Sequence, residues 1–286
     1  MMNIRLAAIV CAAAIGLPSF ALGAEKPTIA LKNGSVATYE LGDMILHAYQ
    51  TGDPLADECF VLETADKLIA VESPPFAANI EDWKNYLAGK NKPLTDVFLS
   101  YHPNGGKWFG NATTHATESA QRAITGGGTK QLVENLHGVF GDSFNTDIPL
   151  IDGILVPGEN IVGGVEFEII DDADGYDIAI PAAKAVYLHM LGANVHSLLV
   201  NLEHMDATIA KLEGFRKNGY AMIISGHHTP ETMVDADIKI AYIRKVKEIA
   251  LGSANKNEFI RRIKTAYPSY AGENYLDMTA SALFAE

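Results

Sequence analysis

Short runs of hydrophobic residues separated by polar turns dominate the first part of the chain. Several runs alternate between hydrophobic and polar positions and are rich in β-branched and aromatic residues, which is typical of half-buried strands. The pattern predicts two hairpins, with strands at residues 36–40 and 44–49 and at residues 59–62 and 68–71. A helix is predicted from about residue 79 to 88, because hydrophobic residues recur there at helical spacing and Gly89 follows as a stop.

Later in the chain, hydrophobic runs end in loops that contain histidine. Residues 97–99 lead to His102, residues 185–188 lead to His189, and residues 221–225 lead to Gly226 and His227. Each run is bounded by glycine, proline or a polar turn, as expected for a buried strand. The same pattern predicts strands at residues 165–171 and 178–180, helices through residues 117–124, 202–212 and 234–251, a further helix beginning near Asn255, and loops at residues 126–128 and 138–164.

The first 23 residues have the three-part pattern of a secretory signal peptide. Arg5 gives the start a positive charge, residues 6–17 are almost wholly hydrophobic, and small residues follow. The hydrophobic stretch is too short to span a bilayer. We therefore expect residues 1–23 to be a signal peptide, residues 24–286 to form one domain, and the protein to be exported to the periplasm or beyond the cell, with no membrane attachment after cleavage.

Composition and motifs narrow the classes of partner and reaction. The 286 residues carry a formal net charge of −13, which disfavours nucleic acid and anionic membranes as partners. After removal of residues 1–23 only Cys59 remains, so the chain has no partner for an internal disulfide. A Gly-x-Ser-x-Gly elbow and a dinucleotide-binding glycine motif are both absent from the sequence. A small-molecule substrate or ligand is expected, and the oligomeric state is left open.

Histidine is the residue type that could carry chemistry in this chain. Of nine histidines, His102, His189 and His227 each follow a predicted strand, and His196 comes seven residues after His189. Neutral imidazole is a good ligand for zinc and related metals. If the three strands end at one sheet edge, these positions predict a metal site there; the alternative is that each histidine caps its own strand. No function is expected for three other histidines. His47 should lie in a strand, His137 in a loop and His204 on the polar side of a helix.

The order of these elements resembles the metallo-β-lactamase superfamily over residues 35–285. The hairpin at residues 57–72 is similar to the family's opening hairpin, and residues 97–106 resemble the strand that carries its His-x-His-x-Asp-His-x-Gly-Gly motif. Residues 180–187 resemble the strand before its metal-bridging aspartate, and residues 223–227 resemble its closing Gly-His motif. The resemblance implies an α/β fold in which two mixed β-sheets, flanked by helices, form an αββα sandwich with metals at one edge.

The chain departs from the family's main metal-binding motif. His102 matches the second histidine of that motif, whereas Ser100 stands in place of the first. Asn104 and Gly105 stand at the Asp-His positions, or else two residues are deleted there. Serine and asparagine are poor metal ligands, and glycine has no side chain to act as one. Most donors for a second metal are therefore missing.

The remaining family positions define the candidate site. His189 falls at the position of the bridging aspartate, and His227 matches the final histidine. The resemblance implies that His102, His189 and His227 hold at most one zinc ion or similar divalent metal. His196 matches a histidine that many relatives have seven residues after the aspartate, and it is expected to be a fourth ligand or a proton donor.

Two functions from different classes stay open at this point. One is an exported hydrolase in which a single metal activates water for attack on a small ester, lactone or amide-type bond. The other is a catalytically inactive, metal-free binding or regulatory protein on the same fold. Redox or sulfur chemistry has only the resemblance of the fold in its favour.

Overall fold

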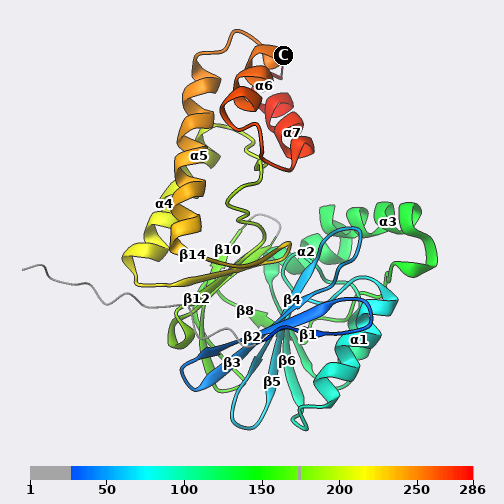
Figure 1. Ribbon diagram of the computed structural model, residues 1–286. Helices are drawn as coiled ribbons and strands as arrows, with labels where there is room; N and C mark the ends of the chain where they lie inside the picture. Colours follow the sequence, from blue (N-terminus) through cyan, green and yellow to red (C-terminus); the bar gives the residue numbers. More distant parts are fainter. Residues whose placement is uncertain (1–26, 173–174, 286) are drawn as a thin grey trace, which may run out of the picture.

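The computed structural model describes residues 27–172 and 175–285. The expected signal peptide at residues 1–23 therefore lies outside the described residues. Within them, two mixed β-sheets pack face to face and helices cover the outer faces (Figure 1). The αββα sandwich implied by the sequence is confirmed.

The first sheet has eight strands that follow one another in chain order. Neighbouring strands are antiparallel from β1 to β5 and parallel from β5 to β8. Both predicted hairpins are confirmed as β2–β3 and β4–β5. The strands are β1 (Ile29–Ala30), β2 (Ser35–Leu41), β3 (Met44–Gln50), β4 (Glu58–Glu63), β5 (Leu68–Val71), β6 (Leu94–Phe98), β7 (Thr113–Thr117) and β8 (Gly153–Leu155).

The second sheet has six strands in the order β14-β13-β12-β11-β10-β9. Strands β12 and β13 are parallel neighbours, so their carboxyl ends lie at the same edge of the sheet. The other pairs in this sheet are antiparallel. The strands are β9 (Gly158–Val162), β10 (Val165–Asp171), β11 (Tyr176–Ile180), β12 (Ala185–Leu188), β13 (Met222–Ser225) and β14 (His228–Thr232).

Aromatic side chains fill the space between the two sheets. Phe98 of β6 packs on Phe167 of β10 with ring centroids 4.7 Å apart, and Phe60 of β4 meets Tyr187 of β12 at 6.1 Å. All four rings are buried. Burial of such large apolar side chains is the main favourable contribution to folding, so this layer holds the two sheets in a defined relative position.

Helices cover both outer faces of the sandwich. On the first sheet, Trp83 of α1 is buried and stacks on Tyr49 at 5.0 Å between ring centroids. On the second, α4 and α5 cover the sheet, and α6 and α7 pack against the far part of α5 (Figure 1). We call α4 to α7 the helical lobe. The helices are α1 (Ala77–Ala88), α2 (Glu118–Gly126), α3 (Gly128–Phe140), α4 (Leu202–Lys217), α5 (Met233–Leu251), α6 (Lys256–Ala266) and α7 (Glu273–Leu283), and the 3₁₀ turns are η1 (Gly106–Phe109), η2 (Gly141–Ser143) and η3 (Pro181–Ala183). Over the described ranges, none of the helices has the length and apolar character needed to cross a bilayer.

Three predictions of loops were wrong. Residues 126–128 do not open a long loop, because Gly127 alone is extended and α3 starts at Gly128, which places His137 in a helix. Residues 138–164 contain β8 and β9. The glycines in and around these short elements hide their periodicity, and the elements are held by tertiary contacts. The histidine-containing loop expected after residues 221–225 is also shorter than predicted, because β14 begins at His228; β14 is an edge strand, where Pro230 is tolerated.

His47 of β3 is expected to make the protein less stable in acid. Its ring is 1% exposed, with Nδ1 2.8 Å from the Tyr86 hydroxyl and Nε2 2.8 Å from a Glu63 carboxylate oxygen. Burial lowers the pKa of His47 to about 4, below its ordinary value of 6.5. As the pH falls from 6.5 to 4, the unfolded chain gains a proton here that the folded chain does not, so the free energy of unfolding falls. The loss due to this group is about 2–3 kcal/mol.

Urea denaturation of the wild type and a His47→Gln variant at about pH 7 and about pH 4.5 measures this contribution. Glutamine does not titrate, so the variant should lose less stability between the two pH values. Equal losses in both proteins would show that His47 does not carry the effect.

Candidate metal centre

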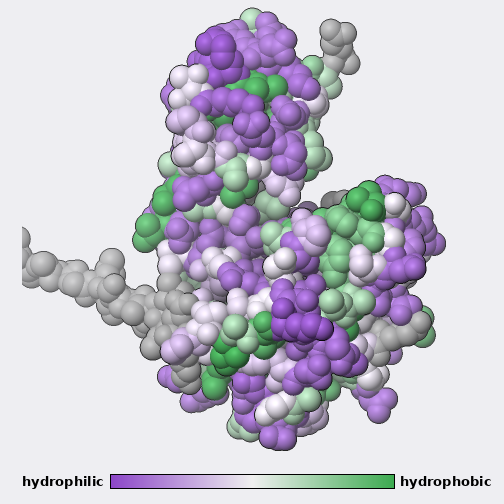
Figure 2. Space-filling view, turned by 45° about the vertical axis from the view of Figure 1, so that its right-hand side comes forward, coloured by the Kyte–Doolittle hydropathy of each residue, from purple (hydrophilic) through white to green (hydrophobic). Residues whose placement is uncertain are grey.

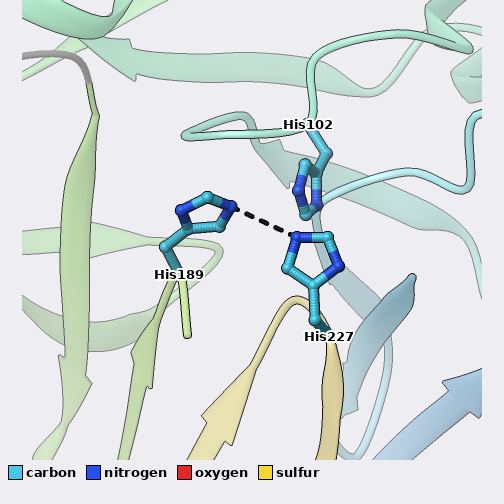
Figure 3. Close-up of side chains that lie close together, drawn as sticks. All are labelled: His102, His189 and His227. Atoms are coloured by element: carbon cyan, nitrogen blue, oxygen red, sulfur yellow. Dashed lines mark hydrogen bonds between the residues drawn. The ribbon is translucent and has the colours of Figure 1, made fainter. Parts of the chain in front are cut away.

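Three histidines from distant parts of the chain meet at one edge of the sandwich. His102 lies in the loop after β6, His189 directly follows β12, and His227 lies in the turn between β13 and β14. One ring nitrogen from each lies within 4.8 Å of the others (Figure 3). The structure therefore brings together the three residues that the sequence proposed as metal ligands.

Backbone hydrogen bonds hold the three loops against one another. The Gly226 amide donates to the His189 carbonyl at 3.0 Å, which links the loops after β12 and β13. The Glu58 amide donates to the Gly226 carbonyl at 2.7 Å, which ties the His227 turn to the first sheet. Gly226 is required for close packing, because a Cβ added there would lie 2.6 Å from Cε1 of His102. These contacts fix the relative positions of the histidines before any ligand binds.

The buried carboxylate of Glu72, at the end of β5, holds the loop that carries His102. It accepts hydrogen bonds from the backbone amides of Ser100, Tyr101 and His102, at 2.7–3.3 Å, and from the Tyr187 hydroxyl at 2.9 Å. Burial has the larger effect on the pKa of Glu72 and raises it to about 7, whereas these hydrogen bonds act to lower it. This role of Glu72 was not predicted, although an acidic residue directly after the predicted strand at residues 68–71 is a visible signal in the sequence.

The protonation state and spacing of the histidines suit a metal ion. Burial lowers the pKa of His102 well below its ordinary value and that of His189 to about 4, so both rings are neutral near pH 7. Nδ1 of His102 is buried and has no hydrogen-bond partner among the described residues. Nε2 of His189 and Nε2 of His227 are 3.3 Å apart. The ligand nitrogens of two imidazoles on a tetrahedral zinc, with zinc–nitrogen bonds of about 2.0–2.1 Å, are separated by about the same distance. The three residues therefore fit one divalent metal.

Asp57 orients one of these histidines, and no sequence pattern indicates this contact. One of its carboxylate oxygens lies 3.2 Å from Nδ1 of His227, which leaves Nε2 of that ring directed toward His189. Asp57 is buried, and its carbonyl accepts hydrogen bonds from the amide and hydroxyl of Thr51. A carboxylate behind a metal-binding histidine sets the ring orientation and its tautomer. Asp57 directly precedes β4 and lies far from His227 in the sequence, so only its position in space reveals this contact.

Replacing Asp57 with asparagine is expected to weaken metal binding by about 10- to 100-fold, since outer carboxylates of this kind have effects of that size. The shape of the side chain is kept and the negative charge is lost. Competition with a chromophoric chelator measures the affinity, and Asp66→Asn, in an exposed turn of the first sheet, is the matched control. Wild-type affinity in Asp57→Asn would contradict the proposed role.

The positions that replace the family's other ligands have different contacts. The hydroxyl of Ser100 donates to the Tyr176 carbonyl at 2.8 Å and accepts from the Tyr176 amide at 2.7 Å, which joins the two sheets. The amide group of Asn104 donates to a backbone carbonyl in the loop before β8. Gly105 has φ of 98°, and a Cβ added there would lie 2.5 Å from Oγ of Ser73. These residues therefore do not form a second metal site.

The structure corrects the expectation for His196. This residue is 1% exposed, its Nδ1 lies 2.9 Å from the Tyr242 hydroxyl, and its ring packs near Tyr270. It does not belong to the group of converging nitrogens. The loop after β12 turns toward the helical lobe, where aromatic side chains enclose His196, so the sequence spacing of seven residues does not bring it to the site.

The remaining histidines do not belong to the group of converging nitrogens. His228 begins β14 and packs against Gly192, and His115 of β7 lies 2.8 Å from a carboxylate oxygen of Asp96 within the first sheet. His204 is exposed near the start of α4, as expected.

The comparisons with known proteins find similarity in structure. No protein-family model and no curated protein matches the sequence. The stereoselective inverting sec-alkylsulfatase Pisa1 from Pseudomonas sp. superposes with a TM-score of 0.62 at 14% identity, over 86% of this chain and 49% of that chain. This chain thus spans about half the length of that enzyme.

Two smaller proteins match over most of their own length. A metallo-β-lactamase family protein from Thermus thermophilus has a TM-score of 0.57 at 12% identity, over 84% of this chain and 91% of that chain. The metallo-β-lactamase FIM-1 from Pseudomonas aeruginosa, in a mono-zinc form, has a TM-score of 0.50 at 12% identity, over 73% of this chain and 95% of that chain.

These similarities identify the class of fold. The chain has the metallo-β-lactamase fold, and the resemblance suggested by its sequence is confirmed at the level of the fold. A fold does not specify a reaction, so the function depends on the residues of the histidine site.

Proposed function

We propose that this protein is a hydrolase that uses one divalent metal, held by His102, His189 and His227, to cleave a small ester, lactone or amide-type substrate. The observation that carries the proposal is the convergence of three ring nitrogens within 4.8 Å on this fold. Zinc bound by three histidines supplies Lewis acidity that polarises a carbonyl and lowers the pKa of water.

The protein's own residues prepare the site for this chemistry. Asp57 orients His227, Glu72 holds the backbone of His102, and the ring of Tyr101 stacks on His189 with centroids 4.5 Å apart. In the net reaction the bond between the acyl carbon and its leaving group breaks. Water supplies a hydroxyl group to the acyl carbon and a proton to the departing alcohol or amine.

The site faces a cavity of suitable size for a small molecule. The cavity has a volume of about 640 Å³ and is lined by all three histidines and by Asp57. Pockets for small ligands have volumes of about 300–1,000 Å³. A sulfate ester, the substrate class in the name of the sec-alkylsulfatase, is the competing class for this cavity.

One observation favours the second function, a metal-free binding or regulatory protein. Nε2 of His189 and Nε2 of His227 lie within hydrogen-bond distance of each other, so these two rings can satisfy one another without a metal. Nδ1 of His102 has no such partner among the described residues, which favours the metal-dependent hydrolase.

Export is part of the proposal and rests on the sequence at residues 1–23. We propose a periplasmic or extracellular protein that acts on a small molecule and binds neither nucleic acid nor membrane. N-terminal sequencing of the native protein should find Ala24 or Glu25 first. Retention of Met1 in the functional protein would contradict export by this route.

The hydrolase is tested by assaying p-nitrophenyl butyrate cleavage with the wild type, the chelator-treated protein and the same protein after zinc is restored. Activity should disappear with the metal and return with zinc, and it should be absent in His102→Ala. Ester cleavage that survives both metal removal and His102→Ala would contradict the proposal. A folded protein that binds no metal would favour the binding protein.

A further inference from the structure

The walls of the histidine cavity come from two separate parts of the fold. Helix α3 supplies one wall with Leu132, Val133 and Leu136. Leu198, in the segment before α4, and Met278 of α7 supply the other. Figure 2 shows a hydrophobic surface over the α3 region, facing a notch below the helical lobe. The cavity therefore places the polar histidine site beside two apolar walls.

Two of these wall residues, Leu132 and Met278, are unusually exposed for large hydrophobic side chains. Leu132 is 53% exposed and Met278 is 50% exposed, so both present apolar surface to solvent within the described structure. A ligand lying between them would remove this surface from water, which is favourable in proportion to the apolar area buried. Exposed apolar surface gathered in a concave site is typical of ligand binding.

The charge of the lining restricts the substrate further. No lysine or arginine lines this cavity among the described residues, whereas the carboxylates of Asp57 and Asp172 do. A sulfate or phosphate group would leave water with the metal as its only cationic partner and would lie near two carboxylates, which is costly. An ester or lactone carbonyl is uncharged and avoids this cost.

We propose that the cavity takes an uncharged ester or lactone with a medium-length hydrophobic acyl chain. The carbonyl group lies at the three histidines, and the chain lies between Leu132 of α3 and Met278 of α7. This inference rests on the proposed hydrolase function and names its substrate class. The proposed substrate class includes acyl esters and excludes sulfate and phosphate esters, which a metal-dependent hydrolase could otherwise cleave.

A series of p-nitrophenyl esters with one leaving group and a growing acyl chain tests the inference. From acetate through butyrate to hexanoate, kcat/KM of the zinc-loaded protein should rise by about threefold to fourfold for each added methylene. p-Nitrophenyl sulfate and p-nitrophenyl phosphate should react at least about 100-fold more slowly than the hexanoate ester, because no lysine or arginine among the described lining residues would join the metal in balancing their charge. Equal rates across the acyl series, or preferred cleavage of the sulfate or phosphate, would overturn the inference while leaving a hydrolase.

Substitutions in the wall locate the acyl chain. Leu132→Asn and Met278→Asn should each lower the ratio of hexanoate to acetate kcat/KM by about threefold to tenfold, since a polar amide replaces apolar contact. Val139→Asn is the matched control, because Val139 is a 73% exposed hydrophobic residue of the same helix α3 and does not line the cavity. Its ratio should equal that of the wild type. An unchanged ratio in both wall variants would contradict this placement.

A binding measurement keeps the substrate class separate from catalysis. The uncharged fluorophore N-phenyl-1-naphthylamine should bind the wild type and be displaced by methyl hexanoate but not by methyl acetate, and binding should weaken in the double variant Leu132→Asn/Met278→Asn. Binding with displacement but without ester cleavage would support the hydrophobic ligand class and refute the hydrolase. Absence of binding, together with a flat acyl series, would refute the ligand class.

Discussion

Protein purified without a histidine tag is expected to retain one equivalent of zinc or a similar divalent metal, and His102→Ala or His227→Ala should lose it. Each substitution removes one of three converging imidazoles. If three ligands share a binding free energy on the order of 10–16 kcal/mol, removal of one lowers the affinity by about three orders of magnitude. Metal analysis after dialysis, with competition titration against a chelator, measures both stoichiometry and affinity.

The expected stoichiometry of one follows from the residues at the other family positions. Ser100 bonds to the backbone of Tyr176, and Gly105 has no room for a side chain beside Ser73. Two metal ions held close together by imidazoles alone would also repel each other strongly. Two equivalents that survive dialysis would contradict this reasoning and restore a dinuclear site.

A control for the histidine variants is available in the same chain. His204→Ala removes an exposed histidine near the start of α4 and should leave the metal content unchanged. If no metal is bound by a correctly folded wild type, the metal-free binding protein becomes the better description.

Replacing Glu72 with alanine is expected to lower the free energy of unfolding by about 3–5 kcal/mol, because loss of a buried charged partner leaves polar groups unsatisfied. Three backbone amides and the Tyr187 hydroxyl would lose their acceptor in a site with no exposure to solvent. Glu72 also has φ of 63°, a left-handed backbone conformation that residues other than glycine rarely adopt. The hydrogen bonds of its carboxylate help to maintain this conformation.

The loop that carries His102 should lose its defined position in the same variant. Urea denaturation measures the stability, and the chelator competition measures the metal affinity, which should fall together with it. Glu72→Gln keeps the shape of the side chain but directs an amide group toward donors, so it should also be destabilised, by about 2–4 kcal/mol.

Glu81→Gln is a suitable control for the Glu72 variants. Glu81 is exposed on α1, and its neutralisation should change the stability by less than about 0.5 kcal/mol. Wild-type stability in both Glu72 variants would show that the loop is held by other contacts.

Local sequence patterns predicted most elements of this fold because their signals lie within short stretches of chain. The hairpins at β2–β3 and β4–β5 have alternating or fully hydrophobic strands with polar turns between them. The start of α6 was visible from Asn255, whose side chain accepts from the Glu258 amide. By contrast, α3, β14 and α7 escaped prediction, because their short or irregular patterns are completed by packing against other elements.

The sequence by itself determined which histidines follow buried strands, because a hydrophobic run and the polar residue after it are adjacent in the chain. Only the tertiary structure decided that His102, His189 and His227 meet, since β6 lies in one sheet and β12 and β13 lie in the other. The same holds for Asp57 and Glu72, whose partners are far away in the chain. It also holds for the exclusion of His196 and for the apolar walls of the cavity. Contacts between distant segments depend on how the sheets pack, and no local pattern of residues encodes that geometry.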